Sequence, residues 1–126
     1  MDALDPATTF VHLGTGPDVT LVPVGPEFWA TIGQRDDLQH GRLITCFEQG
    51  GDWDVWERHP AGDEVIHVLG GSCTFHLDHN GAESSVRAAA GTFVVVPAGA
   101  WHTVDVHEPG RILVITWGEG TEHRPR

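Results

Sequence analysis

Residues 53–64, WDVWERHPAGDE, combine an apolar run, a turn and several side chains able to bind a metal ion. Side chains two positions apart in a β-strand point to the same face, so Glu57 and His59 project together. The turn at 60–63 then places Glu64, which begins the next apolar run, beside them. This stretch therefore predicts two strands that bring two carboxylates and an imidazole within a few ångströms of one another.

A second segment, residues 91–102, adds one more nitrogen ligand, because it ends with His102 at the start of a strand. Two histidines and two carboxylates form a mixed nitrogen and oxygen ligand set with a formal charge of −2. Such a set suits Mn, Fe, Ni or Zn, and its hard oxygens favour Fe or Mn. The candidate cofactor is therefore a divalent metal ion.

Short β-rich runs surround these segments, and glycines and prolines separate them at intervals of about ten residues. No stretch has a sustained helical period, and residues 26–34 form at most one helical turn. Many short strands with turn residues between them predict an all-β sandwich or barrel. The expected strands are Thr20–Val24, Arg42–Glu48, Trp53–His59, Val65–Leu69, Ser72–Asp78, Ser84–Ala88, Thr92–Val96, Trp101–His107 and Arg111–Trp117. Asn80-Gly81 predicts a hairpin turn, because both residue types tolerate a positive φ.

The chain is divided into three parts along its length. Residues 1–39 contain four prolines and predict an N-terminal arm that packs along the barrel or onto a second subunit. Residues 40–118 form the barrel. Residues 119–126 are polar and end in Arg-Pro-Arg, which predicts a partly ordered tail.

Length and composition indicate one globular domain: 126 residues and 13.7 kDa, with 40% apolar and 20% charged residues. No apolar run approaches the ~20 residues that span a bilayer. The first twenty residues lack the basic start and apolar stretch of a signal peptide. We therefore expect a cytoplasmic protein.

The charged residues exclude several function classes. The formal net charge is −11, and all seven basic residues are arginine. Without lysine, Schiff-base chemistry and a P-loop are both excluded. Without a basic run, neither nucleic acid nor an anionic membrane surface is an expected partner. A small molecule is the expected ligand.

The two segments together resemble the paired motifs of the cupin family of small β-barrels. The first cupin motif is G-x5-H-x-H-x(3,4)-E-x6-G, and the second is G-x5-P-x-G-x2-H-x3-N. Their matching positions in this chain are Gly51, His59, Glu64 and Gly71, followed by Gly91, Pro97, Gly99 and His102. The resemblance, which extends to small single-domain bacterial cupins, implies a jelly-roll barrel, also called a double-stranded β-helix.

Two positions depart from the cupin motifs: Glu57 replaces the first histidine, and Val106 replaces the final asparagine. The resemblance implies that His59, Glu64 and His102 bind metal, with Glu57 in the fourth position. Glu64 could instead serve as a catalytic general base beside a three-coordinate metal. The alternative for Glu57 is a carboxylate paired with an arginine, in a site that has lost its metal.

Other residues are assigned by strand parity. Trp53 and Val55 share the face of Glu57 and are expected to line the pocket. His76 and Val104 are further pocket candidates. His76 could equally lie on a solvent-exposed face of the sheet, and Val104 could instead be part of the barrel core. His67 lies three residues after Glu64 and points to the opposite face, in a structural or dimer-interface role.

Three classes of function remain open. The resemblance implies a metal-dependent enzyme, either a dioxygenase, an isomerase, a decarboxylase or a lyase. The alternatives are a non-enzymatic barrel that binds a small ligand and a structural barrel without metal. We also expect a homodimer, because a second subunit is a common cover for an exposed sheet edge.

Overall fold

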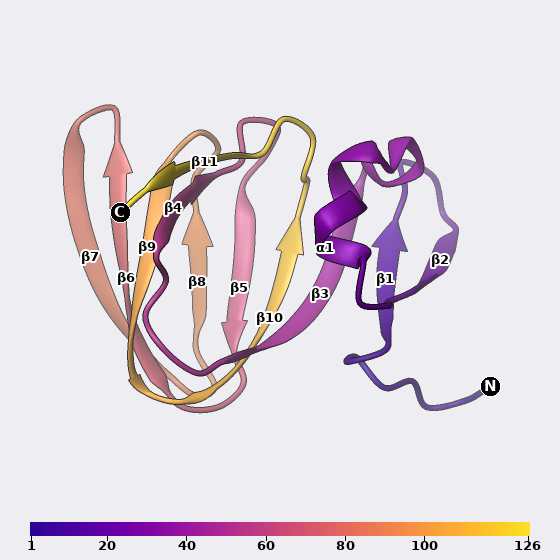
Figure 1. Cartoon of the computed structure of the whole chain (residues 1–126), viewed down its shortest axis with the longest axis horizontal. Coiled ribbons are helices and arrows are strands. Elements are labelled where there is room, and N and C mark those ends of the chain that lie inside the picture. The colour runs from indigo at the N-terminus through magenta and orange to yellow at the C-terminus, as the bar shows by residue number, and fades with distance from the viewer.

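The computed structural model describes residues 1–126 as two antiparallel sheets that enclose an apolar core (Figure 1). The strands are β1 (Thr9–Leu13), β2 (Val19–Pro23), β3 (Arg42–Gln49), β4 (Val55–Arg58), β5 (Glu64–Val68), β6 (Ser72–His79), β7 (Ala82–Ala89), β8 (Phe93–Val96), β9 (Trp101–Glu108), β10 (Gly110–Thr116) and β11 (Glu122–Pro125). Between β2 and β3 lie one turn of α-helix, α1 (Phe28–Thr31), and two 3₁₀ turns, η1 (Ile32–Gln34) and η2 (Asp36–Leu38). The six-stranded sheet has the order β2-β1-β3-β10-β5-β8, and the five-stranded sheet has the order β11-β4-β9-β6-β7. The all-β prediction is confirmed.

The main core lies between the two sheets and is built from alternate residues of their strands. Ile66 on β5 and Ile112 on β10 come from one sheet, and Phe75 on β6 and Val104 on β9 come from the other. All four side chains are fully buried. Because side chains alternate between the two faces of a strand, this packing fixes which residues point into the barrel.

Tight turns join the strands where the sequence predicts them. Asn80 and Gly81 have φ angles of 55° and 84°, which form the hairpin between β6 and β7. Gly71 also has a positive φ of 76°, and a Cβ atom there would overlap the carbonyl oxygen of Glu108. Only glycine meets both requirements at position 71.

The nine expected strands are all present, with ends that differ by at most two residues from those predicted. The structure adds β1 and β11, one near each end of the chain. β1 joins the six-stranded sheet next to β3, and β2 pairs with β1 at its edge. A small second core, with Phe10, Phe28 and Leu43 among its members, packs the N-terminal segment against the barrel.

The C-terminal segment forms strand β11, where the sequence predicts a partly ordered tail. β11 pairs with β4 over four residues. Ion pairs hold it in place: Arg124 lies 3.0 Å from Asp78, and Arg58 lies 2.5 Å from Glu122. Because charged contacts rather than buried apolar side chains hold this strand, it has no apolar alternation that sequence analysis could detect. The helices, of four residues at most, are too short to cross a bilayer.

Candidate metal centre

Three neighbouring strands bring the four candidate ligands together at one end of the barrel. Glu57 on β4 lies directly opposite His102 on β9 in the strand register. Glu64 is the first residue of β5 in the other sheet, and His59 directly follows β4. One ligand atom from each of these residues lies within 4.8 Å of every other. The cluster has the size and donor types that suit a metal ion.

The turns of the two cupin-like motifs are joined by hydrogen bonds. The backbone amide of Ala98 donates to Oδ1 of Asp63 over 2.8 Å. The amide of Gly99 donates to the carbonyl oxygen of His59 over 2.9 Å. Asp63 therefore links two turns that lie 35 residues apart in the chain, and the link holds His59 near His102.

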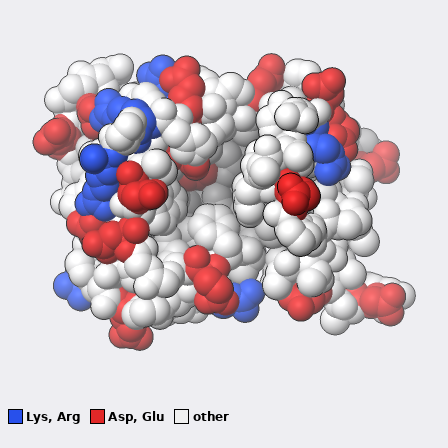
Figure 2. Space-filling view, viewed as in Figure 1, with Lys and Arg blue, Asp and Glu red and all other residues white.

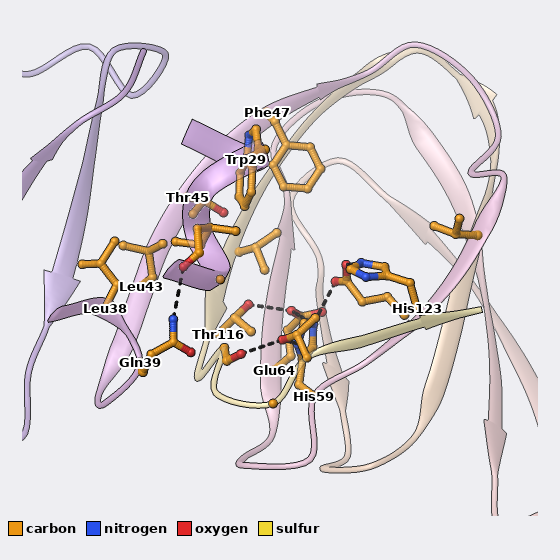
Figure 3. A pocket seen from close by; sticks show the side chains of 18 of the residues that line it. Trp29, Leu38, Gln39, Leu43, Thr45, Phe47, His59, Glu64, Thr116 and His123 are labelled. Atoms are coloured by element: carbon orange, nitrogen blue, oxygen red, sulfur yellow. Dashed lines mark hydrogen bonds and ion pairs between the residues drawn. The ribbon is translucent and has the colours of Figure 1, made fainter. Parts of the chain in front are cut away.

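Each imidazole ring lies against both carboxylates, and Figure 3 shows His59 beside Glu64. Nε2 of His59 lies 2.9 Å from Oε1 of Glu57 and 2.8 Å from Oε2 of Glu64. Nε2 of His102 lies 3.2 Å from Oε1 of Glu64 and 4.0 Å from Oε1 of Glu57. Thr116 on β10 donates its hydroxyl to Oε2 of Glu64 over 2.5 Å. Both rings and the Glu64 carboxylate are buried, so few water molecules can compete for these atoms.

The Nδ1 atoms of both histidines have hydrogen-bond acceptors outside the cluster. His102 Nδ1 lies 3.3 Å from the carbonyl oxygen of Ala100, which can only accept a proton. His59 Nδ1 lies 2.8 Å from the hydroxyl of Thr121, and that hydroxyl donates its own proton to the carbonyl of Gly118. Each ring is therefore a donor at Nδ1, as expected for histidines that bind a metal through Nε2.

The Nε2 atoms of His59 and His102 are buried and make no hydrogen bond of acceptable geometry. If the rings are neutral, each Nε2 atom directs a lone pair toward two carboxylates. This arrangement is unfavourable unless a cation lies between the nitrogens and the carboxylates. A metal ion would meet both nitrogens and both carboxylates at once. The donor set and the unpartnered nitrogens therefore fit a divalent ion.

The pKa values show how the metal-free centre balances its charge. Burial lowers the pKa of His59, but contact with the Glu57 and Glu64 carboxylates outweighs burial and raises it to about 9. Burial raises the pKa of Glu64, but its contacts with His102 and His59 lower it to about 2. Burial likewise raises the pKa of Glu57, and contact with His59 brings it below its ordinary value. Without metal, the His59 ring is therefore an imidazolium between two carboxylates.

A cavity of about 790 Å³ leads from the cluster toward the N-terminal segment. Its polar end contains Glu57, His59 and Glu64, and its other end is mostly apolar, with Gln39 and Thr45 as polar exceptions. The apolar lining includes Trp29, Ile32, Leu38, Leu43 and Phe47 (Figure 3). The surface is hollowed near the centre of the face shown in Figure 2, and acidic side chains, drawn red, are visible in the hollow. The cavity thus offers a charged end for a polar group and an apolar wall for the rest of a ligand.

The predicted pocket residues occupy three different environments. Trp53 and Val55 line the cavity. Val104 is fully buried in the main core and does not reach it. His76 lies 2.7 Å from Asp105 and lines a separate shallow hollow, because the inward positions of β6 belong to Phe75 and its alternate neighbours. His67 stacks on Phe93, with ring centroids 4.5 Å apart.

The residues that support the cluster from the C-terminal segment and from β10 are not among those predicted from the sequence. Thr121 and His123 near the C-terminus contact His59 and Glu57, and Thr116 contacts Glu64. Trp29 brings the N-terminal segment to the cavity. The two-residue spacing of Thr121 and His123 was the available signal, but nothing in their sequence indicates which strand they pair with.

Residues 43–116 match the family model described as "Cupin domain". This chain belongs to the cupin family. The match covers more than half of the chain and includes both motif segments, so the predicted family membership is confirmed. It also includes every ligand candidate from Glu57 to His102.

Two curated relatives of this cupin are named acireductone dioxygenase, both from strains of Rhodopseudomonas palustris. The TIE-1 protein is 32% identical over 117 residues, which is 93% of this chain and 58% of that protein. The CGA009 protein is 31% identical over 99 residues, which is 76% of this chain and 56% of that protein. The chain thus spans less than two thirds of the length of either relative.

Solved structures share the cupin fold. A cupin-2 domain protein from Shewanella frigidimarina has a TM-score of 0.51 and 24% identity, covering 68% of this chain and 71% of that chain. Lactobacillus farciminis oxalate decarboxylase has a TM-score of 0.54 and 18% identity, covering 68% of this chain and 26% of that chain. At these identities the likeness concerns the fold alone.

Proposed function

We propose that this cupin is a metal-dependent dioxygenase that acts on a small molecule. The observation that carries the proposal is the pair of buried Nε2 atoms of His59 and His102, which face two carboxylates at the end of a cavity. The names of the two Rhodopseudomonas palustris relatives support dioxygenase chemistry over isomerase, decarboxylase or lyase chemistry.

Glu57, His59, Glu64 and His102 would hold the metal ion, with Fe or Mn favoured over Ni or Zn because two of four donors are carboxylates. When bound, such an ion polarises coordinated oxygen atoms and, if redox-active, supports chemistry with O₂. Two carboxylates and two neutral imidazoles carry a charge of −2, so a divalent ion would leave the centre neutral.

The protein's own residues would orient the substrate and exclude water. Thr116 holds the Glu64 carboxylate through a 2.5 Å hydrogen bond, which keeps one oxygen of Glu64 from turning toward the substrate. Trp29 packs edge-on against Phe47 at the apolar end, with ring centroids 6.2 Å apart. We therefore propose a substrate with oxygen donors at one end and an apolar body at the other.

Metal analysis of purified protein tests this proposal. The protein is prepared without a His tag or chelator, and its metal content is measured by plasma mass spectrometry beside Glu57→Ala and His102→Ala. Near-stoichiometric Fe or Mn in the natural protein, lost in both variants, is the expected result. Consumption of O₂ that depends on an added enediol or catechol compound would then support dioxygenase activity. Absence of metal after reconstitution would refute the metal centre.

A non-enzymatic ligand-binding role is the second candidate. The protonated His59 ring already offsets much of the charge of Glu57 and Glu64, so the centre can exist without an ion. This candidate predicts stoichiometric binding of a small molecule to metal-free protein, measured by calorimetry, with no O₂ consumption.

We propose that the six-stranded sheet pairs with a second copy of this chain through its outer face. An apolar row crosses all six strands in register and consists of Leu21, Val11, Ile44, Ile115, Val65 and Val95. Leu21 and Val95 are each more than half exposed. Because each copy has a net charge of −11, an uncharged row is the favourable contact for a like-charged partner. Sedimentation of the natural protein and of the Val95→Asp variant tests the proposed dimer. The natural protein is expected to be a dimer and the variant a monomer. A monomeric natural protein would refute the proposal.

A further inference from the structure

Strand β11 brings His123 onto the carboxylate that replaces the first histidine of the cupin motif. His123 lies opposite Glu57 in the register of β11 and β4, and its Nε2 is 2.6 Å from Oε2 of Glu57. The other oxygen of Glu57, Oε1, faces His59 at 2.9 Å and His102 at 4.0 Å. The two oxygens of one carboxylate therefore have separate partners.

This division matters because a carboxylate is a less defined ligand than an imidazole. An imidazole presents one nitrogen lone pair, whereas a free carboxylate presents two oxygens and can rotate or bind through both. The Glu57 side chain is also 25% exposed, against 3% for Glu64, so water can reach it. A donor fixed on Oε2 leaves only Oε1 for the centre.

The position of His123 is set by the strand and not by the ring alone. Its neighbour Arg124 is paired with Asp78 and lies over the rings of Trp56 and Trp101, at 5.2 Å and 4.5 Å from their centroids. On the other side, Glu122 is paired with Arg58. β11 is thus anchored immediately before and after His123.

We propose that His123 is a positioning residue that makes Glu57 a single-oxygen metal ligand, so that Glu57 and β11 act as one unit. The inference rests on the proposed metal centre. It explains how a carboxylate can occupy a position where the cupin motif has an imidazole. It also assigns a function to the C-terminal residues, which lie outside the family match at 43–116.

A double-mutant cycle tests the proposal, with Co²⁺ affinity measured by chelator competition and the ligand field read from visible absorption. In the natural background, His123→Leu is expected to weaken Co²⁺ binding by about 10- to 100-fold. His123→Gln keeps an N–H donor near Oε2 and is expected to retain affinity within about threefold. Glu57→His restores the usual motif and removes the carboxylate that His123 holds. In that background His123→Leu is expected to change affinity by less than about threefold.

The cycle separates positioning from a merely structural role. If His123→Leu acted by loosening β11, it would also disturb the Thr121 contact with His59, and the loss would persist in Glu57→His. His107→Leu, a histidine on the exposed end of β9 that contacts Thr74, is the control and is expected to leave affinity unchanged. Melting temperatures of all variants monitor the fold.

Each outcome has a distinct meaning. An equal loss in both backgrounds, or no loss in the natural background, would overturn the inference while the metal centre stands. Failure of the natural protein to bind Co²⁺ would overturn the proposed function and this inference together.

Discussion

The Nδ1 atom of His59 lies 2.8 Å from the hydroxyl oxygen of Thr121, although the two residues are 62 positions apart. Since Thr121 donates its own proton to the carbonyl of Gly118, it accepts the Nδ1 proton of His59. This contact determines which nitrogen of His59 faces Glu57 and Glu64. A residue near the C-terminus thereby sets the protonation of a candidate metal ligand in the first cupin motif.

Thr121→Val tests that relationship with little change in side-chain shape. Valine cannot accept the Nδ1 proton, so the ring loses its fixed orientation, and metal affinity is expected to fall by about 10- to 100-fold. Competition titration with a chelator measures the effect. Thr20→Val on the exposed face of β2 is the matched control. Unchanged affinity in Thr121→Val would show that the hydroxyl does not orient the ring.

The stability of the metal-free protein is expected to decrease at both ends of the pH range. The pKa of His59 is raised from 6.5 to about 9, so its contribution is complete below about pH 6.5 and is lost as the pH rises through 9. The pKa of Glu64 is lowered from 4.5 to about 2, so its contribution is present above about pH 4.5 and is lost as the pH falls toward 2. Urea denaturation across pH 3–10 should show a plateau between these limits.

Metal binding should remove the alkaline decrease, because an ion replaces the His59 proton. Below pH 9 that proton must leave when metal binds, so affinity should rise with pH by up to about tenfold per unit. Calorimetry in two buffers of different ionisation enthalpy counts the released proton. Affinity independent of pH between 6 and 8 would contradict the imidazolium assignment.

Two glycines of the first motif should differ sharply in their tolerance of alanine. Gly71 has a positive φ, and an added Cβ would overlap the backbone of Glu108, so Gly71→Ala should reduce the free energy of unfolding by at least about 2 kcal/mol. Gly51 has open space around it and no positive φ, so Gly51→Ala should lie within about 0.5 kcal/mol. Urea denaturation of both variants measures the difference. An equal loss of stability in the two variants would show that the local backbone does not explain why glycine is needed at position 71.

Asp63→Ala should loosen the link between the two motif turns. The amide of Ala98 loses its charged acceptor, which should reduce the free energy of unfolding by about 1–3 kcal/mol. Metal affinity should decrease as well, because His59 and His102 lie on the two joined turns. Asp18→Ala, at an exposed residue whose side chain makes no hydrogen bond or ion pair, serves as the control. A stability loss without any change in affinity would show that the link holds the fold but not the ligands.

Much of the barrel and the four-residue cluster could be predicted from local sequence. Strand parity placed Glu57 and His59 on one face, and the turn at 60–63 placed Glu64 beside them. Parity cannot distinguish core from cavity along an inward face: it predicts Val104 in the pocket, and the structure buries Val104 fully in the core. Parity also cannot decide which face of β6 points into the core. Phe75 occupies the inward position, so its neighbour His76 lies on the opposite face.

The cupin family, the strand pattern and the four candidate metal ligands could be predicted from the chain alone, because they depend on residue spacing along short segments. The contacts that hold these four side chains are visible in the three-dimensional structure alone: Thr121 and His123 near the C-terminus contact His59 and Glu57, and Trp29 from the N-terminal segment lines the cavity. The contacts of Thr121 and His123 join residues more than 60 positions apart through strand pairing and ion pairs. Such pairings are selected by the energy of the whole fold, and no local pattern in the chain specifies them.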